Sequence, residues 1–504
     1  MSDNGSAKAG LGDSEHLSVL GHGNTYHRSM SLWANLALGF TYLSPLVAIY
    51  AYFGLGLATA GPGSVFWILI VGAGQLLVAL VMGEVVSQYP IAGGIYPWMR
   101  RLWGARSAWF AAWIYVWAMI VTITSVAEYG TGFLANVLGI TEITPEITLT
   151  LALVLLVIAL VLNLGGTKML SRVARIGLMA ELVGVVGLGL YFLIFQRKND
   201  LSVFFDGFIN GGEDYMTAFV GAAIVGLFMF YGFEACGDVA EEVSDAARQV
   251  PRAMYLTIFV GGISALMSYV GYVLAAPDLQ KIIDDYNSGA NYDPIGTILT
   301  AILGETGMRI FLVVAVMAFI SCILSLQAAA SRLLHSFARD HMLPGSAWLS
   351  KISPRSQVPT NALIVASVVP MALCVVIYVN PATLLPITMF AVLGIYIAFQ
   401  SVVLAALRQR VKGWKPAGPF SLGQWGIVVN VAALAYGIWA IYTLMQPGVS
   451  GDFATDYVVH IGLATVIVVG TVYFLIARPD RKSTAPQGDA LEVAAKIREA
   501  HAAK

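Results

Sequence analysis

The sequence predicts an all-α polytopic membrane protein with twelve transmembrane helices. The first reason is composition: 58% of the 504 residues are hydrophobic, 11% are charged and the mean hydropathy is +0.76, whereas an ordinary soluble chain carries roughly 25% charged residues. The second reason is that the apolar runs match the ~20 residues that a helix needs to cross a bilayer. The third is that the first and sixth runs are both interrupted by glycine and polar residues.

Twelve apolar runs are the predicted spans. A strand of a membrane barrel would be half as long and would alternate apolar and polar residues, so each run is predicted to be a helix. The runs cover residues 33–60, 64–88, 106–134, 147–164, 175–195, 216–240, 252–276, 307–334, 360–379, 383–407, 424–446 and 456–477.

The positive charges predict on which side of the membrane the chain ends lie. If the N-terminus is cytoplasmic, 24 of the 28 Lys and Arg residues fall in cytoplasmic segments. Only Arg197, Lys198, Lys281 and Arg309 then face outward. Because cytoplasmic loops carry an excess of Lys and Arg, we expect both termini in the cytoplasm and the protein in the plasma or inner membrane.

The first span is expected to be a broken helix. Its sequence LALGFTYLSPLVAIYAYFGLG contains Gly39, Thr41, Ser44 and Pro45. A proline inside a helix removes one backbone hydrogen bond and clashes with the preceding turn. The break is therefore predicted between Thr41 and Leu46.

The sixth span begins as an apolar helix and becomes acidic before it is long enough to cross. Gly232, Glu234, Gly237 and Asp238 fall inside it. Glycine lets the backbone leave helical geometry, and non-helical backbone at membrane depth is tolerated only where protein buries it or where it lines a cavity. In many secondary transporters such broken helices form the substrate site.

The spacing of the spans predicts an internal repeat. The first and sixth spans lie about 185 residues apart, as do the second and seventh. Two repeats of five helices have opposite topology because five is an odd number. The predicted divisions are a flexible cytoplasmic lead (1–31), two repeats (32–213 and 214–410), two further helices (411–478) and a cytoplasmic tail (479–504) that is either a short amphipathic helix or a solvated stub.

Several other classes of protein are disfavoured. The net charge of −1 does not indicate a nucleic-acid partner. Cys236, Cys322 and Cys374 lie in apolar runs without the spacing of a metal or redox site, so neither a metal nor a cofactor is expected. No nucleophile–base pair or Gly-rich phosphate loop indicates an enzyme. Nothing in the sequence indicates an oligomeric state.

Three segments resemble the amino acid–polyamine–organocation (APC) superfamily, and within it the bacterial and fungal amino-acid and GABA permeases. They read GLATAGPGSVFWILIVGAGQLLVALVMGEVVSQYPIAGGIYPW, FYGFEACGDVAEEVSDAARQVPRA and SRLLHSFARDHMLPGSAWLSKISPRSQVPTNA, and the resemblance runs from Ser31 to Arg478. One departure is Gly83 before Glu84, where the family usually has alanine. The resemblance implies the twelve-helix fold of the bacterial leucine transporter, alternating access and uptake of small amines or amino acids, often driven by protons.

The substrate site is expected at the two breaks. Glu234 follows the second break in a Tyr-Gly-Phe-Glu pattern that resembles the family's, and a charge at the membrane centre costs about 2.5–3.5 kcal/mol or more. It either serves the substrate or is a structural carboxylate that ties the broken helix to its neighbours. Nearby rings suit an ammonium ion, although such rings also simply pack. The expected substrate-binding residues are Thr41, Tyr42, Leu43, Ser44, Phe228, Phe230, Tyr231, Gly232 and Glu234.

Glu181 is the expected proton-coupling residue. It stands alone in the fifth span, in GLMAELVGVVGLGL, without a basic partner nearby in the sequence. Some superfamily members carry a lysine at about this position, where its amine takes the place of a coupling sodium ion. The resemblance implies that a residue here touches the base of the first helix, and a desolvated carboxylate exchanges a proton near neutral pH. The alternative is that Glu181 snorkels to the cytoplasmic interface.

Three further acids are gate or vestibule candidates. Glu128 lies near the outer end of the third span, either in an external vestibule or solvated at the interface, and Glu84 ends the second span as a gate or a helix anchor. Asp238 leaves the sixth span with Glu241 and Glu242, where the three acids are candidates for a closed-gate network with arginines. Ion pairs of this kind contribute little to the free energy of folding when they are exposed to solvent.

The sequence favours a proton-coupled importer of an amino acid or a related zwitterion such as GABA, because half-helix ends offer N–H groups to a carboxylate and carbonyls to an ammonium. The alternative is an importer or exchanger of polyamines or organic cations, since the spans hold several acids and no buried base. A nontransporting enzyme or receptor is the third class. The expected partners are a small-molecule substrate and the lipid bilayer, and the expected coupling ion is H⁺.

Overall fold

A computed structural model describes residues 12–23, 26–140, 142–207, 215–448 and 451–502 of the chain. Across these residues the protein is helical, and the one β-type pairing is an isolated bridge between Met30 and Val243. Ten helical stretches among them are long and apolar enough to cross a membrane. The prediction of an all-α membrane protein is therefore confirmed. The predicted boundary at 213 and 214 lies outside the described residues.

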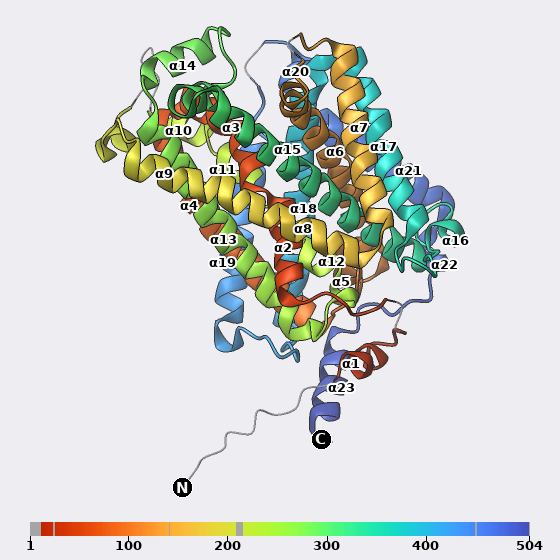
Figure 1. The fold of residues 1–504 in the computed structure, drawn as a ribbon. Coiled ribbons are helices and arrows are strands. Elements are labelled where there is room, and N and C mark those ends of the chain that lie inside the picture. The colour runs from red at the N-terminus through yellow and green to blue at the C-terminus, as the bar shows by residue number, and fades with distance from the viewer. Residues whose placement is uncertain (1–11, 24–25, 141, 208–214, 449–450, 503–504) are drawn as a thin grey trace.

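The helices form a bundle with short connecting helices at both ends (Figure 1). The long helices and the segments that continue them are α2 (Leu32–Leu43), α3 (Pro45–Ala60), α4 (Phe66–Gln88), α6 (Ala105–Val137), α7 (Pro145–Leu164), α8 (Thr167–Glu181), α9 (Leu188–Phe195), α13 (Ala246–Ala275), α15 (Pro294–Arg339), α17 (Thr360–Val379), α18 (Leu384–Val411), α19 (Gly426–Leu444) and α21 (Val458–Ala477). The shorter helices are α1 (Asp13–Val19), α5 (Ile95–Leu102), α10 (Tyr215–Gly221), α11 (Ile224–Met229), α12 (Ala235–Asp238), α14 (Leu279–Asn287), α16 (Ser346–Leu349), α20 (Phe453–Asp456), α22 (Pro479–Lys482) and α23 (Ala490–Ala502).

The observed helices follow the predicted spans with differences at their ends. The residues from Pro294 form a helical stretch that non-helical backbone at Gly304, with φ 63°, separates from the eighth span, close to its predicted start at residue 307. The fifth span begins at Thr167 rather than at residue 175, and the eighth ends at Arg339 rather than at residue 334. Both predictions stopped where apolar residues stop, but a helix continues outside the bilayer as long as its backbone hydrogen bonds are made. Capping residues in the sequence determine where several of the observed helices begin. Asp293, for example, accepts a hydrogen bond from the Gly296 N–H and caps α15.

The packing places the two interrupted helices at the centre of the bundle. The first half of the first span, α2, packs against α8, α13 and α15, and α4 packs along α13. Helix α6 lies against α15 and α18. Helices α19 and α21 lie at the periphery, and α21 is mostly exposed along its length. Helix α12, after the second break, contacts α2, α13 and α15, so both interrupted helices lie inside the bundle.

Two short helices from the chain ends lie together below the bundle (Figure 1). Helix α1 packs against α23, and we call this end of the bundle the terminal face. The N-terminal lead was predicted to be flexible, and this is wrong for α1, in which His16 and Leu17 are buried. The tail is the amphipathic helix rather than a solvated stub, with Ala490, Val493, Ala494 and Ile497 on its buried side.

Buried polar contacts hold the tail to the bundle. Arg100, on α5, donates to the Pro486 and Ala485 carbonyl oxygens at 3.2 and 2.7 Å. Its neighbour Arg101 pairs with Asp489 and also donates to the Leu20 carbonyl. Both arginines are only 2% exposed, so the tail supplies partners that these buried charges require.

Candidate functional site

The first break is a single residue. Helix α2 ends at Leu43, α3 begins at Pro45, and Ser44 between them is left-handed with φ 39° and ψ 85°. Proline has no N–H and cannot continue α2, but it suits the first position of α3. The break lies inside the predicted interval from Thr41 to Leu46, although Thr41 itself is helical and its hydroxyl donates to the Ala37 carbonyl at 2.8 Å.

The second break spans a few residues between α11 and α12. Gly232 has φ 114°, a conformation that L side chains rarely adopt. A Cβ atom at this position would lie 2.7 Å from the backbone nitrogen of Leu43. The glycine therefore lets the second break approach the end of α2. The two predicted breaks meet at one point in the bundle.

Glu234 forms hydrogen bonds within and across the second break. Its carboxylate accepts a hydrogen bond from the Gly232 N–H at 2.7 Å and another from the Tyr115 hydroxyl, on α6, at 3.0 Å. The residue is fully buried. Both contacts are with protein, so the structural role considered for Glu234 is present in this closed arrangement.

Glu181 lies against the first break. One carboxylate oxygen accepts from the Ser44 hydroxyl at 3.0 Å and from the Leu46 N–H at 3.4 Å. The other oxygen is buried and has no hydrogen-bond partner among the described residues. Glu181 is 0% exposed, so the snorkelling alternative is wrong. A π-helical turn, Leu182–Gly187, follows directly, and such turns are frequent at functional sites.

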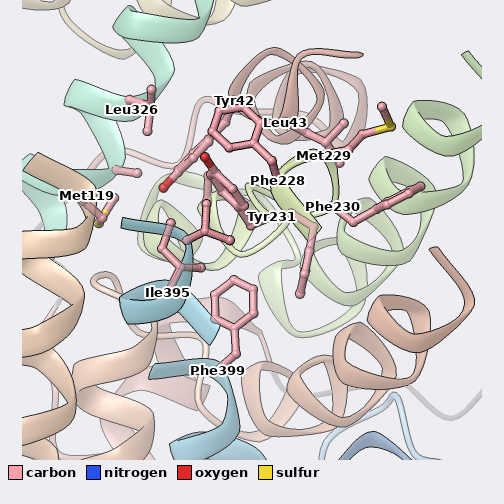
Figure 2. Packing of buried hydrophobic residues seen from close by; sticks show 14 of the residues in the cluster. Tyr42, Leu43, Met119, Phe228, Met229, Phe230, Tyr231, Leu326, Ile395 and Phe399 are labelled. Carbon is pink, nitrogen blue, oxygen red and sulfur yellow. The ribbon is translucent and has the colours of Figure 1, made fainter. Parts of the chain in front are cut away.

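Two tyrosines stand between the breaks. The rings of Tyr42 and Tyr231 meet edge to face with centroids 6.4 Å apart, and Phe228 lies 5.5 Å from Tyr231. Figure 2 shows Tyr42 and Tyr231 next to each other within the buried cluster. The Tyr42 hydroxyl is buried and has no hydrogen-bond partner among the described residues. It is a buried polar group close to the Glu234 carboxylate, at the meeting point of the breaks.

Phe230 differs from the prediction. Its ring lies close to Gly72 on α4 and Gly262 on α13, so it packs between helices rather than beside Tyr42 and Tyr231. The reason is the irregular backbone of the break, which turns successive side chains in different directions. For this residue the simple packing interpretation fits the structure.

Helix α15 adds residues that the sequence did not single out. The Ser325 hydroxyl lies 2.8 Å from the Thr41 hydroxyl, and the Cys322 thiol donates to the Tyr42 carbonyl at 3.4 Å. Tyr115 on α6 was also missed. Small hydroxyl and thiol side chains are common in apolar helices, so no pattern distinguishes these positions in the sequence.

Buried ion pairs close the terminal face below the breaks. Arg332 on α15 donates to Glu242 at 2.8 Å, and Arg339 donates to Glu241 at 3.2 Å. Asp238 takes no part in this network among the described residues. Its buried carboxylate has no hydrogen-bond partner there and lies close to Gly94. The acidic run after the second break thus seals the route from the site to this face.

Glu84 is an anchor rather than part of the site. Its carboxylate pairs with Arg410 at the end of α18 and accepts a hydrogen bond from the Ser421 hydroxyl at 3.4 Å. These contacts fasten α4 to the connection between α18 and α19. Of the two roles considered for Glu84, the helix anchor fits the structure.

Two pockets lie near the opposite end of the bundle. One, of about 250 Å³, is lined by residues that include Tyr50, Tyr129, Phe133 and Asp293. Glu128 lines a second, separate pocket of about 220 Å³ with Cys374 and neighbouring residues. Glu128 and its neighbour Tyr129 line different pockets, because consecutive residues of a helix point to different sides.

Known proteins are similar to this chain over most of its length. Residues 30–474 match the family described as amino acid permease. An amino-acid permease, BAT1, of Arabidopsis thaliana is 25% identical over 84% of this chain and 86% of its own. A putative polyamine transporter of Candida albicans is 24% identical over 92% and 87%. The thiamine transporter thi9 of Schizosaccharomyces pombe is 23% identical over 86% and 80%.

Proposed function

Because the chain belongs to the amino acid permease family, we propose that it imports an amino acid or a related small zwitterion such as GABA by proton-coupled alternating access. It is a multi-pass membrane transporter rather than an enzyme, as its relatives are transporters of amino acids or organic cations. The observation that carries the proposal is the contact between the two breaks at Ser44 and Gly232. Broken helix ends leave N–H and carbonyl groups without helical partners.

Both charged ends of a zwitterion find partners at this contact. The N-terminal end of α3, a helix of 16 residues that starts at the first break, carries the positive end of a helix dipole and suits the carboxylate of a substrate. The carbonyl groups at the C-terminal ends of α2 and α11 suit its ammonium group. The buried Tyr42 hydroxyl and the ring of Tyr231 lie between these ends. The proposal includes the predicted substrate-binding residues apart from Phe230, namely Thr41, Tyr42, Leu43, Ser44, Phe228, Tyr231, Gly232 and Glu234.

The proposal includes twelve crossings in an inverted repeat of five and five. Residues Leu32–Gln88 form one 57-residue helical stretch, whose length of roughly 85 Å at 1.5 Å per residue is far more than one ~30 Å bilayer core requires. Its turn at Gly61–Val65 separates two crossings. The sixth crossing combines α10, α11 and α12. With the positive-inside rule, the terminal face is cytoplasmic.

In this scheme the structure is closed toward the cytoplasm. The ion pairs of Arg332 and Arg339 seal the terminal face, while the pocket beside Tyr50 and Asp293 lies at the outer end. Inward opening requires these ion pairs to separate and the substrate to leave past Asp238. Glu181 is the proposed coupling group because it binds the hinge of the first break directly.

A second candidate is import or exchange of polyamines or organic cations. The observation that favours it is the outer pocket, in which Asp293 is the one ionisable lining acid and aromatic rings surround it. Such a pocket attracts cations through charge and through the faces of its rings. Two of the similar proteins carry polyamine or thiamine in their names.

A ligand panel followed by a transport assay tests the proposal. Purified protein is heated with GABA, common amino acids, putrescine, spermidine or choline. A true ligand at about 100 times its Kd adds about 2.7 kcal/mol to the free energy of unfolding. We expect zwitterions to raise the melting temperature and to accumulate in proteoliposomes under an inward proton gradient, and a protonophore to abolish accumulation. Stabilisation by polyamines or choline alone would replace this proposal with the cation transporter.

A further inference from the structure

A pocket of about 530 Å³ lies on the terminal face, away from the breaks. Three segments that are distant in the sequence line it. They are residues 27–29 of the N-terminal lead, 165–168 at the start of α8, and 355–357 in the connection after α15. The pocket therefore lies between the N-terminal lead and elements of both predicted repeats. The transport function proposed above does not involve it.

The side chains that line this pocket are strongly basic. Arg28, Lys168 and Arg355 carry positive charge, and no acidic residue is among the lining residues. Lys168 and Arg355 form no ion pair with any described residue of the chain. Arg28 lies 3.5 Å from Asp13, yet one of its terminal nitrogens is buried and has no hydrogen-bond partner among the described residues. Three cations around one cavity repel one another unless an anion neutralises them.

Neutral donors complete the lining. Ser29, Ser356 and Gln357, which carry hydroxyl and amide groups, are among the lining residues. Gly166 lies so close to the Ser356 backbone that an added Cβ would be 2.7 Å from the Ser356 carbonyl oxygen, and no side chain caps the start of α8. Several cations with hydroxyl and amide donors form a suitable environment for phosphate oxygens.

We propose that this pocket binds a phosphate group, carried either by the headgroup of an anionic phospholipid of the adjacent leaflet or by a soluble phosphate compound. A single phosphate ion is much smaller than the 530 Å³ cavity, so the cavity also has room for the rest of a headgroup. Basic pockets between transmembrane helices are known to hold such groups.

The pocket is connected to the closed gate by direct contacts. Thr167, which lines the pocket, donates a hydrogen bond to Glu242, and Glu242 pairs with Arg332. Arg28 donates to the Val243 carbonyl at 2.9 Å. An anion that holds Arg28, Lys168 and Arg355 together therefore braces the segments that must separate for inward opening. This regulatory effect rests on the proposed transport function, whereas binding itself does not.

Binding is measured first, without any transport assay. The full-length chain and the double variant Lys168→Gln/Arg355→Gln are compared by native mass spectrometry after extraction from phosphatidylcholine vesicles with or without phosphatidylglycerol. In a second arm, the melting temperature is followed with inorganic phosphate. We expect the double variant to bind its ligand at least about tenfold more weakly, because it loses two charge-assisted contacts. Retained phosphatidylglycerol identifies a lipid, and a phosphate-dependent shift identifies a soluble ligand.

The matched control is Arg252→Gln/Lys351→Gln, which removes the same charge from the terminal side without touching the pocket lining. It should bind as the parent chain does. The variant Lys168→Arg/Arg355→Lys keeps both charges and should also bind. Its binding would show that the Gln variant binds weakly because it lost charge and not because it failed to fold. The proposal is overturned if the parent chain and the Lys168→Gln/Arg355→Gln variant bind the ligand equally well. It is also overturned if the Arg252→Gln/Lys351→Gln control loses as much binding as that variant does. If binding is lost as expected, faster efflux from proteoliposomes by the Gln variant supports the bracing role.

Discussion

At the scale of single residues, two buried carboxylates serve the two breaks in different ways. Glu234 uses both oxygens, one for the Gly232 N–H and one for the Tyr115 hydroxyl. Glu181 uses one oxygen for Ser44 and Leu46, while the other has no partner among the described residues. A proton on the free oxygen of Glu181 costs no existing hydrogen bond. Glu181 is therefore the better site for reversible protonation.

We expect Glu181→Gln to uncouple transport from the proton gradient. Glutamine keeps an oxygen for Ser44 and Leu46 but cannot change its charge. A proton drives a conformational change only if its affinity for the protein differs between the two states. Accumulation driven by a pH gradient should be lost, while exchange between loaded vesicles should persist. Gradient-driven uptake at the parent rate would exclude Glu181 and leave Glu128 or Glu234 as the coupling group.

Glu234→Gln should reduce uptake while leaving the protein folded. The amide cannot accept both the Gly232 N–H and the Tyr115 hydroxyl, and loss of a hydrogen bond to a charged group costs about 1.5–3 kcal/mol. Tyr115→Phe is the matched variant, since it removes one of these contacts and keeps the charge. Uptake and melting temperature are measured for both. Unchanged uptake in Glu234→Gln would reject a functional role for the charge.

The sequence predicted the carboxylates of the site but not their uncharged neighbours. A charge in an apolar run is conspicuous because burying it is expensive, so Glu181 and Glu234 were found. Tyr115 and Ser325 were not, because such residues also fill ordinary apolar helices. Phe230 was placed beside the substrate because proximity along the chain does not give the direction of a side chain in irregular backbone.

At the scale of elements, each break is specified by one residue with unusual backbone requirements. Ser44 precedes the proline that starts α3, and Gly232 has a positive φ where it contacts Leu43. Both breaks were predictable from glycine and proline in otherwise apolar runs. Their mutual contact was not, because it depends on how α2 packs beside α11 and α12.

Gly232→Ala should destabilise the protein and abolish uptake. The new Cβ would lie 2.7 Å from backbone of the other broken helix, and a left-handed non-glycine residue costs about 1–3 kcal/mol. Thermal unfolding in detergent measures the effect. Gly132→Ala in α6 is the control, since no atom lies within 4 Å of its added methyl group. A melting temperature equal to that of the control would show that the contact at Gly232 is not required.

At the scale of the whole molecule, α1 and α23, the first and last described helices, are part of the folded structure. His16 on α1 donates to the Gln88 carbonyl at 3.0 Å, and Asp13 accepts hydrogen bonds from the first amides of α13. The ten described helical stretches that are long and apolar enough to cross a membrane were predictable from their hydropathy. The docking of the ends was not, because helices as short as α1 give no periodic signal long enough to recognise.

We expect the docking of α1 to weaken as the pH falls. Burial lowers the pKa of His16, and it lowers the pKa of His22 to about 3. A histidine whose folded-state pKa is lowered stabilises the docked state fully above its unfolded pKa of about 6.5 and progressively less below it. Hydrogen exchange of residues 13–19, corrected for the intrinsic effect of pH, should rise between about pH 7 and pH 5.

The control for this effect is the double variant His16→Gln/His22→Gln. Glutamine does not titrate in this range, and its amide can still donate to the Gln88 carbonyl. Its exchange should be independent of pH after the same correction. A parent chain with equal protection at both pH values would contradict the assignment to these histidines.

The docked tail also matters for how the protein is made. Arg100 and Arg101 are synthesised nearly 400 residues before the Ala485, Pro486 and Asp489 groups that they bind. Until the tail is synthesised, these two charges lack the partners that it supplies. A chain that stops after Ala477 therefore loses these contacts and uncovers the face of α1 against which α23 packs. We expect such a truncated chain to unfold at a lower temperature than the longer chain.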